Sequence, residues 1–499
     1  MRGADLLIQT LAKAGVTKIF SLSGNQIMPV YDACIDAKIE IIHTRHEAAA
    51  IFMADAWAQL TGEVGIAMIT AAPGFANGMG PLFTARLSES PVILLSGDSP
   101  ISQDGKGTFQ ELDQVSISAP LTKASWRARR AANLGNEIAR AIRTATSGRP
   151  GPVHIALPFD VVEDKIDDVS LPSENAFKRE NQQATKRDLE QIRTLVEQAE
   201  KPLILTGPLL NKTRAGQLLN ELEQSLDSPV ITMESPRGLK DPALGSFAEA
   251  LKQADLILNL GKVVDFTLGF GNTSISSPSC KWLLVDPDAD MRDRAFLNLG
   301  SRLVKSIAAD TRSVARALIE NGSRATDRAE WRQHTAELIN KRTTNTDKLV
   351  EGKISPAALC EAVQRQIEKS ENSLAICDGG EFGQWAQAGT NAKDRLINGI
   401  SGAIGGCLCY AVGAKKARPD ATIFALMGDG TVGFHFGNDE CWNAEHQIQL
   451  RNYGPDRLIG CQLSGARYDQ SAIGLGCHGE YVTDLADLDA ALERAVSSG

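Results

Sequence analysis

The stretch IEIIHTRHEAAAIFMADAWAQLTG, residues 39–62, decides the fold because it joins a short apolar strand pattern to a long helical one. The run IEIIHT has the length of a strand, and the following segment continues at helical length until Gly62. A strand that leads directly into a helix is half of a βαβ unit, whose next strand lies parallel to the first. The stretch therefore predicts a parallel sheet covered by helices.

The same alternation recurs along the chain and indicates α/β architecture throughout. Further strand patterns in the first third are KIFSL, VGIAMIT, PVILLSG and GPVHIALP. A polar linker, residues 166–188, precedes a second set with KPLILTG, SPVITM, ADLILNLG and KWLLVDP. Charged sequence near 321–352 leads to a third set with SLAICDGG and ATIFALMGDG. We predict three doubly wound parallel-sheet domains over 1–165, 188–325 and 353–499.

The composition limits the partners that this chain is expected to bind. A net charge of -9, without a basic stripe or polybasic segment, argues against nucleic acid and anionic membranes and leaves a small-molecule substrate. No apolar stretch approaches the length of a membrane span. Nine scattered cysteines without a CxxC pair indicate reduced thiols, and the N-terminus has no secretory pattern, so we expect a cytoplasmic protein.

Glu47 stands where the first strand pattern of the opening stretch gives way to the helix. A glutamate in the first turn of a helix commonly serves only the helix dipole. Ligands of doubly wound sheets, however, bind at the carboxyl ends of strands, which is where Glu47 lies. This position suits a carboxylate that exchanges a proton with a heteroaromatic ring. Both interpretations are open at this point.

Six ordered motifs resemble the thiamine diphosphate-dependent enzymes, in particular acetohydroxyacid (acetolactate) synthases, with benzaldehyde lyase and oxalyl-CoA decarboxylase nearby. They are FSLSGNQIMPVYDA, TRHEAAAIFMADAWAQLTG, AAPGFANGMGPLFTA, GTFQELDQVSISAPLTK, SGAIGGCLCYAVGA and MGDG. The resemblance implies pyrimidine-binding, central and diphosphate-binding domains in that order. It also implies a homodimer or homotetramer, because the family's site joins the pyrimidine domain of one subunit to the diphosphate domain of another.

The resemblance also implies roles for individual residues. Glu47 is similar to the glutamate that hydrogen-bonds the aminopyrimidine ring and activates the thiazolium carbon, and the cofactor then carries the carbon–carbon chemistry. Ile404 matches the apolar residue that wedges the two rings apart, although a core isoleucine is the commoner explanation for that residue type. The implied cofactor-binding set is Gly24, Asn25, Ser401, Gly402, Ile404, Gly428, Gly430 and Thr431.

Gln26 and Gln110 are the residues that the resemblance assigns to the substrate pocket. Asn25 and Gln26 match a short loop that faces the reacting carbon, where acetohydroxyacid synthases have small residues and benzaldehyde lyase has alanine and histidine. Asn25 serving a turn and Gln26 as a solvated amide are the plain alternatives. Gln110, in FQE, matches a pocket glutamine of both relatives, with a surface-helix glutamine as its alternative.

The family's magnesium ligands map to Asp429, Asn438 and the backbone carbonyl of Glu440, and hard oxygen ligands suit Mg²⁺. Their spacing differs from the family pattern, because about two dozen residues that normally lie between GDG and the asparagine are absent. We place this missing segment between 436 and 437. The third domain is therefore expected to be shortened, and its C-terminus, ALERAVSSG, is expected to stop before a last strand.

Three functions follow from these patterns. The first is a thiamine diphosphate- and Mg²⁺-dependent lyase or carboligase, acting on a 2-keto acid or 2-hydroxy ketone. The second is a catalytically impaired paralogue that keeps the fold and assembly. The third is an NAD(P)-dependent oxidoreductase, since GDGTVG fits a dinucleotide fingerprint, but FHFGNDECWN after it has poor helical periodicity and no strand pattern.

A flavin is left unassigned from the sequence. The turn GKVVDF, residues 261–266, resembles the flavin-binding turn of acetohydroxyacid synthases. Other relatives bind a different nucleotide there or none, so the turn does not decide between them.

Overall fold

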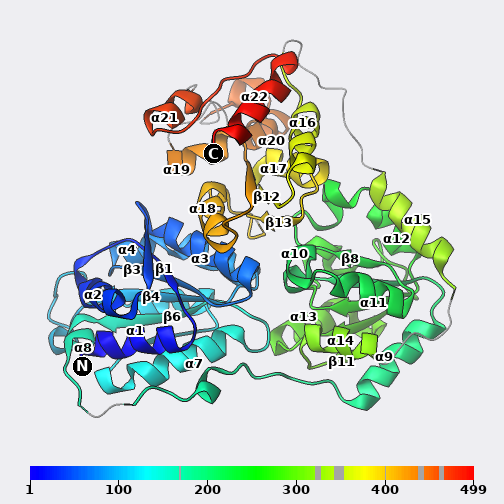
Figure 1. Cartoon of the computed structure of the whole chain (residues 1–499). Helices are drawn as coiled ribbons and strands as arrows, with labels where there is room; N and C mark the ends of the chain where they lie inside the picture. The colour runs from blue at the N-terminus through cyan, green and yellow to red at the C-terminus, as the bar shows by residue number, and fades with distance from the viewer. Residues whose placement is uncertain (168–169, 321–326, 342–352, 399, 437–442, 460–465) are drawn as a thin grey trace.

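The structure is a computed structural model that describes the chain apart from residues 168–169, 321–326, 342–352, 399, 437–442 and 460–465. Three parallel sheets flanked by helices follow one another along the chain, which confirms the predicted α/β fold (Figure 1). In the part of the chain that is described, none of the helices combines the length and the apolar content that a membrane crossing needs.

The first sheet has six parallel strands in the order β2-β1-β3-β4-β6-β5. Its central strands are buried on both faces, as expected for continuous apolar runs such as GIAMI in β3. The strands are β1 (Lys18–Ser21), β2 (Glu40–His43), β3 (Gly65–Ile69), β4 (Val92–Asp98), β5 (Ala124–Arg127) and β6 (Val153–Pro158). The helices around them are α1 (Gly3–Lys13), α2 (Met28–Ala37), α3 (Glu47–Thr61), α4 (Pro73–Asn77), α5 (Met79–Leu87), α6 (Gln114–Ser118), α7 (Leu134–Thr146) and α8 (Phe159–Glu163).

The second sheet has five strands in the order β11-β10-β9-β7-β8. They are β7 (Pro202–Thr206), β8 (Val230–Thr232), β9 (Leu256–Leu260), β10 (Lys281–Val285) and β11 (Leu303–Ile307). Its helices are α9 (Lys186–Gln198), α10 (Lys212–Ala215), α11 (Leu218–Leu226), α12 (Phe247–Gln253), α13 (Ala289–Leu299), α14 (Thr311–Glu320) and α15 (Ala329–Asn340). Trp331 of α15 is buried in this core and donates its indole N–H to the Pro202 carbonyl at 2.8 Å. The helix beyond residue 325 therefore packs against the central sheet.

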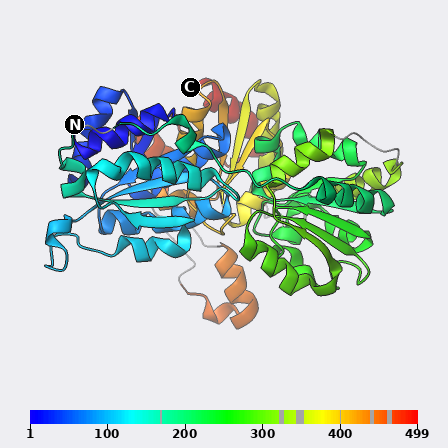
Figure 2. The ribbon, with the colours of Figure 1, turned by 90° about the horizontal axis from the view of Figure 1, so that it is seen from below.

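The third sheet has three strands within the described residues, in the order β13-β12-β14. They are β12 (Ser373–Cys377), β13 (Asp394–Ile397) and β14 (Thr422–Leu426). Its helices are α16 (Pro356–Lys369), α17 (Gly380–Gly389), α18 (Cys407–Ala417), α19 (Asp429–Phe436), α20 (Asn443–Tyr453), α21 (Tyr468–Gly474) and α22 (Leu485–Ser497). Figure 2 shows α20, in orange, projecting from the body of the molecule.

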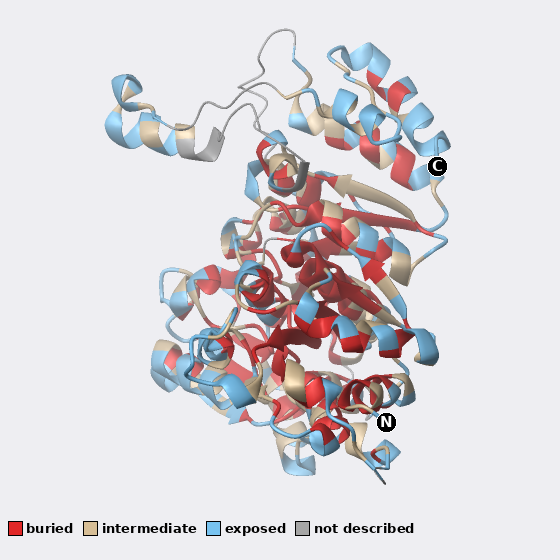
Figure 3. Cartoon of the chain, turned by 90° about the vertical axis from the view of Figure 1, so that its left-hand side faces the viewer, coloured by how far each residue is buried: buried red, intermediate tan, exposed pale blue. Residues whose placement is uncertain are grey.

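The first and third domains share one hydrophobic core through α3 and α18. Small residues allow the two helices to approach closely: a Cβ added at Gly413 would lie 2.6 Å from the Met53 carbonyl oxygen. The hydroxyl of Tyr410 donates a hydrogen bond to the carboxylate of Asp55, and both side chains are fully buried. Figure 3 shows the resulting band of buried residues, which contrasts with the mainly exposed helices at the C-terminal end.

Candidate active site

Glu47 lies at the carboxyl end of the first sheet, as the sequence predicts. It is the first residue of α3, and the His46 side chain before it accepts the N–H of Ala48 at 3.1 Å. Only 9 % of Glu47 is exposed, and its Oε2 accepts a hydrogen bond from Asn77 Nδ2 at 2.9 Å. A Cβ at Gly74 would lie 2.9 Å from Oε1, so the glycine leaves that oxygen free of a covering side chain. Asn77 thus fixes the orientation of the carboxylate through Oε2, and no side chain at position 74 covers Oε1.

Gln26 and Gln110 lie in direct contact, although 84 positions separate them in the sequence. Gln26 Nε2 donates to Gln110 Oε1 at 2.6 Å, while Gln26 Oε1 accepts the hydroxyl of Thr70 at 2.7 Å. Gln26 is buried rather than solvated, whereas the neighbouring Asn25 is exposed. Gln110 is half-buried and lies in a loop rather than on a surface helix. Two residues predicted for one pocket are therefore adjacent in space.

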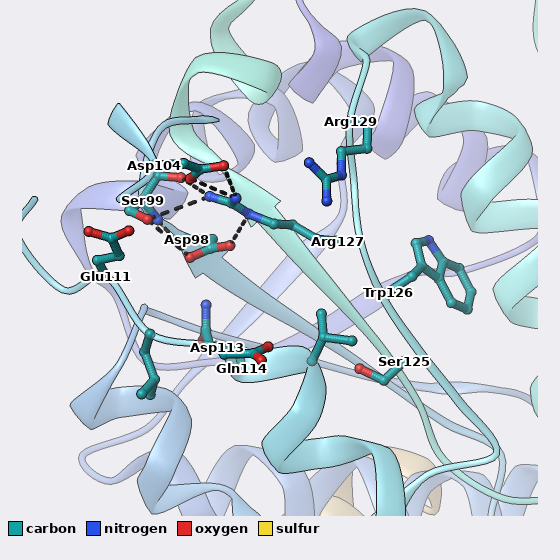
Figure 4. Close-up of a pocket in the computed structure, with 12 residues that line it drawn as sticks. Asp98, Ser99, Asp104, Glu111, Asp113, Gln114, Ser125, Trp126, Arg127 and Arg129 are labelled. Carbon is teal, nitrogen blue, oxygen red and sulfur yellow. Dashed lines mark hydrogen bonds and ion pairs between the residues drawn. The ribbon is translucent and has the colours of Figure 1, made fainter. Parts of the chain in front are cut away.

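The loop that carries Gln110 is fixed by ionic contacts from β5 and from the loop itself (Figure 4). Arg127 donates to Asp98 at 2.5 Å, to Asp104 at 2.7 Å and to the Ser99 carbonyl at 2.7 Å. The carboxylate of Glu111 accepts three backbone N–H groups, those of Gly105, Gly107 and Thr108. These contacts hold Gln110 at φ +60°, a left-handed backbone conformation that is uncommon for residues other than glycine.

The carboxyl ends of β12, β13 and β14 meet at one edge of the third sheet, because Cys377 pairs with both Ile397 and Leu426. Asp378 follows β12, is fully buried, and connects the loops at this edge. Its carboxylate accepts the N–H of Gly379 at 2.8 Å, the N–H of Gly405 at 3.2 Å and the amide of Asn398 at 2.5 Å. Burial raises the pKa of Asp378.

Asp378 and Asn398 were not among the residues predicted from the sequence. The signal for Asp378 is the strand SLAIC ending directly in DGG, since an aspartate at a strand end in this fold faces the ligand edge. Asn398 carries no comparable signal. Its Oδ1 is buried without a hydrogen-bond partner, which marks a polar atom whose partner lies outside the described protein.

The predicted cofactor-binding residues of the third domain gather at this same edge, whereas Gly24 and Asn25 follow β1 in the first domain. A Cβ at Gly380 would lie 3.6 Å from Thr431 and 3.9 Å from Ile404, so these side chains surround the start of α17. Ile404 is half-buried rather than a fully covered core residue. Ser401 contacts the first domain, with its Oγ 2.8 Å from Thr84 Oγ1, and Gly402 next to it adopts φ +81°.

Asp429 opens α19 after β14, and its side chain is exposed. It is flanked by Gly428 and the buried Gly430, and the Thr431 hydroxyl donates to the Gly428 carbonyl at 2.9 Å. Asn438 and Glu440 lie outside the described residues, and within the described ones no group of three side chains suits a metal ion. The carboxylate of Asp429 and the buried, unpaired amide oxygen of Asn398 nevertheless fit Mg²⁺. The glycine backbone beside Asp429 fits a diphosphate.

The glycine motif GDGTVG opens a helix, α19, which includes the first three residues of FHFGNDECWN, where poor periodicity predicted no helix; residues 437–442 of that stretch lie outside the described residues. That expectation was wrong because Asp429 at the first position and the glycine backbone begin a helix that has no clear apolar face to reveal it. In the described part of the chain no strand follows β14, so the second half of a dinucleotide-binding unit is not seen.

The turn after β9 is occupied by a side chain of the first domain. Arg149 donates to the carbonyl of Gly261 at 2.9 Å and forms ion pairs with Glu89 and Asp286. Burial raises the pKa of Glu89, while the charge of Arg149 acts in the opposite direction. This buried network joins the first domain to the central one, and a flavin stays unassigned.

Comparison with known proteins agrees with this geometry. Residues 1–117 match the family model "Thiamine pyrophosphate enzyme, N-terminal TPP binding domain", and residues 378–439 match "Thiamine pyrophosphate enzyme, C-terminal TPP binding domain". Glu47, Gln26 and Gln110 lie in the first match, and the three loops at the edge of the third sheet lie in the second.

The relatives found include a probable acetolactate synthase of Mycobacterium bovis, 29% identical over 528 residues, with 100% of this chain and 94% of the relative aligned. Human 2-hydroxyacyl-CoA lyase 2 is 28% identical, covering 96% of this chain and 84% of its own length. The acetolactate synthase large subunit of Lactococcus lactis is 28% identical over 88% of this chain and 77% of its own length. With its two cofactor-domain matches, its three parallel sheets and these relatives, the chain is similar to the thiamine pyrophosphate-dependent enzymes, acetolactate synthases among them.

Proposed function

We propose that the protein is a thiamine diphosphate- and Mg²⁺-dependent lyase or carboligase that acts on a 2-keto acid or 2-hydroxy ketone. The observation that carries this proposal is the buried carboxylate of Glu47 at a strand end, held by Asn77 and left uncovered by Gly74. When bound, the cofactor supplies a carbon nucleophile and stabilises the negative charge left by carbon–carbon bond cleavage. The relatives' names agree with this reaction class.

The protein's own residues have separable tasks in this proposal. Glu47 accepts or gives a proton at its uncovered oxygen, while Asn77 fixes the orientation of the carboxylate. Ile404 shapes the cofactor pocket, and Asp378 holds the surrounding loops together through its hydrogen bonds. Asp429, Asn438 and the carbonyl of Glu440 are the proposed metal ligands. Gln26 and Gln110 face the substrate.

Replacement of Glu47 by glutamine tests the proposal. The substitution keeps the side chain's shape but removes its proton exchange, so turnover of pyruvate with added cofactor and Mg²⁺ is expected to fall by about 10²–10⁴-fold. Glu63→Gln, near the exposed end of the same helix, is the control and should keep full activity. Unfolding temperatures of both variants should match the unaltered protein. Near-normal turnover by Glu47→Gln would contradict the assignment.

A second candidate is a paralogue that binds cofactor poorly, and two observations favour it. The M. bovis alignment has 528 positions and includes this whole 499-residue chain, so at least 29 of them have no residue from this chain. The edge strand β14 is also only partly covered, since four of its five residues are half-buried. Cofactor affinity separates the two candidates, because an active enzyme must bind thiamine diphosphate tightly.

We further infer a homodimer or homotetramer in the cytoplasm. In support of assembly, no hydrogen bond among the described residues joins Glu47 to the loops at the edge of the third sheet, as expected when a second subunit completes each site. In support of a reducing compartment, the described cysteines are free thiols, and burial raises the pKa of Cys34 to about 12, which keeps it unreactive.

A further inference from the structure

A line of three polar side chains crosses the substrate side of the first domain. Thr70 follows β3, Gln26 lies in the turn after β1, and Gln110 lies in the loop held by Arg127. The hydrogen bonds run in one direction, from Thr70 Oγ1 to Gln26 Oε1 at 2.7 Å and from Gln26 Nε2 to Gln110 Oε1 at 2.6 Å. The direction in which these amides donate decides whether Gln110, the last of them, presents its oxygen or its N–H groups.

Thr70 sets that direction. Among the described residues, the only hydrogen-bond acceptor for the Thr70 hydroxyl proton is Gln26 Oε1. If Gln26 were turned over, its amide would donate to Thr70, and the half-buried hydroxyl proton would lose its acceptor, which is the costlier arrangement. With Oε1 facing Thr70, the amide nitrogen of Gln26 must face Gln110 and occupy its carbonyl oxygen.

Gln110 is therefore left with a free donor. Its Oε1 is engaged by Gln26, and its Nε2 has no hydrogen-bond partner in the described part of the chain. We propose that Thr70 is a positioning residue that orients both glutamine amides so that Gln110 presents N–H groups to the oxygen beside the reacting carbon of the substrate. This inference rests on the proposed function, because that function places Gln110 at the substrate.

Close packing against Gln26 and Thr70 prevents the Gln26 side-chain amide from rotating by 180°. A Cβ at Gly97 would lie 2.7 Å from the Gln26 Cβ, and a Cβ at Gly24 would lie 2.3 Å from Thr70. Backbone therefore lies directly against Gln26 at Gly97 and against Thr70 at Gly24. At the other end, Arg127 and Glu111 fix the loop of Gln110, as Figure 4 shows for Arg127. The donor is preorganised rather than assembled on binding.

The direction of the amides has a consequence for substrate choice. A donor favours a substrate that presents only acceptor oxygens, and a 2-keto acid presents a ketone and a carboxylate. A 2-hydroxy ketone carries a hydroxyl that needs an acceptor, which Gln110 does not offer in this orientation. Of the two substrate classes, the site should therefore prefer the 2-keto acid.

Side-chain amide signals in ¹⁵N-glutamine-labelled protein test the orientation without relying on turnover. The signals of Gln26 and Gln110 are assigned from their absence in Gln26→Glu and Gln110→Glu. Thr70→Val should shift both signals, Thr70→Ser should restore them, and Thr146→Val, which removes a hydroxyl bonded within α7, should leave them unchanged. Unchanged signals in Thr70→Val would overturn the positioning role.

Steady-state kinetics with pyruvate test the donor itself. Gln110→Glu keeps an acceptor for Gln26 but presents an oxygen to the substrate, so KM should rise about 10-fold, the effect of one lost hydrogen bond, with a smaller change in kcat. Thr70→Val should raise KM in the same direction and Thr70→Ser should not. An unchanged KM in Gln110→Glu would overturn the donor assignment. If the unaltered protein turns over neither 2-keto acids nor 2-hydroxy ketones while the amide signals shift as expected, the proposed function fails and the orientation stands.

Discussion

The first and third sheets use similar apolar strands but bury them very differently. All seven residues of β4 are buried, and the strand has β3 and β6 as neighbours. Only Leu426 of the five residues of β14 is buried, and among the described residues this strand pairs with β12 alone. A parallel strand is normally covered on both faces and flanked in its sheet, so β14 has the sequence of an interior strand at the position of an edge.

This difference separates the two halves of the site. In the first domain two hydrogen bonds hold these residues: Asn77 donates to Glu47, and Gln26 donates to Gln110. In the third domain the structure describes Asp429 at the start of α19, but its proposed partners Asn438 and Glu440 lie outside the described residues. The proposed proton-transfer residues are thus held by contacts within the described chain, whereas the proposed metal ligands depend on the short connection after Phe436.

The largest expected effect on cofactor binding concerns that connection. Insertion of a family-like segment after Phe436 should tighten Mg²⁺-dependent binding of thiamine diphosphate by about 10–100-fold, because rigid support of metal ligands is worth that much. Calorimetric titration measures it. A glycine–serine insertion of equal length is the control and should give no gain. Tight, metal-dependent binding by the unaltered chain would show that the short connection is functional.

A buried histidine makes the first domain sensitive to acid. His154 is fully buried between Ser96 Oγ at 2.8 Å and Ser118 Oγ at 2.8 Å, and burial lowers its pKa to about 3. As pH falls, the unfolded chain takes up the proton first, so stability that is complete above the unfolded pKa of 6.5 is lost progressively toward pH 3.

Between pH 6.5 and 4 the free energy of unfolding should fall by about 3 kcal/mol more in the unaltered protein than in His154→Gln, which cannot take up this proton. Urea titrations across this range measure the difference. His478→Gln, at an exposed position, should behave like the unaltered protein. Parallel pH curves for the unaltered protein and His154→Gln would contradict the role of His154.

A smaller effect is expected where the first and third domains meet. Tyr410→Phe removes the hydroxyl that donates to Asp55, leaving one oxygen of a buried carboxylate without that partner while Gln59 still bonds the other at 2.8 Å. The free energy of unfolding should fall by about 1–3 kcal/mol in urea titrations. Tyr453→Phe, at a residue that is 67% exposed, serves as the control. Equal stability of the two variants would mean that the hydrogen bond from Tyr410 to Asp55 makes no net contribution to the free energy of unfolding.

Much of the fold and part of the site were predictable from local patterns. The apolar runs correctly gave three α/β units, and Glu47 was placed at a strand end because the strand and helix patterns meet there. The helix α19 was missed because eight residues without a clear apolar face give no periodic signal. Asn398 was missed because an isolated asparagine after a strand does not indicate what its side chain contacts.

The sequence by itself determined the order of strands and helices, since hydrophobic periodicity is a local property that each segment carries alone. It also determined which residue types stand at the strand ends, including Glu47 and Asp429. Only the tertiary structure decided that Gln26 contacts Gln110, that Thr70 directs their amides, and that Arg149 fills the turn at Gly261. Those contacts join residues far apart in the chain, and they depend on which strand ends the sheet brings side by side and on how closely glycine allows the backbone to pack.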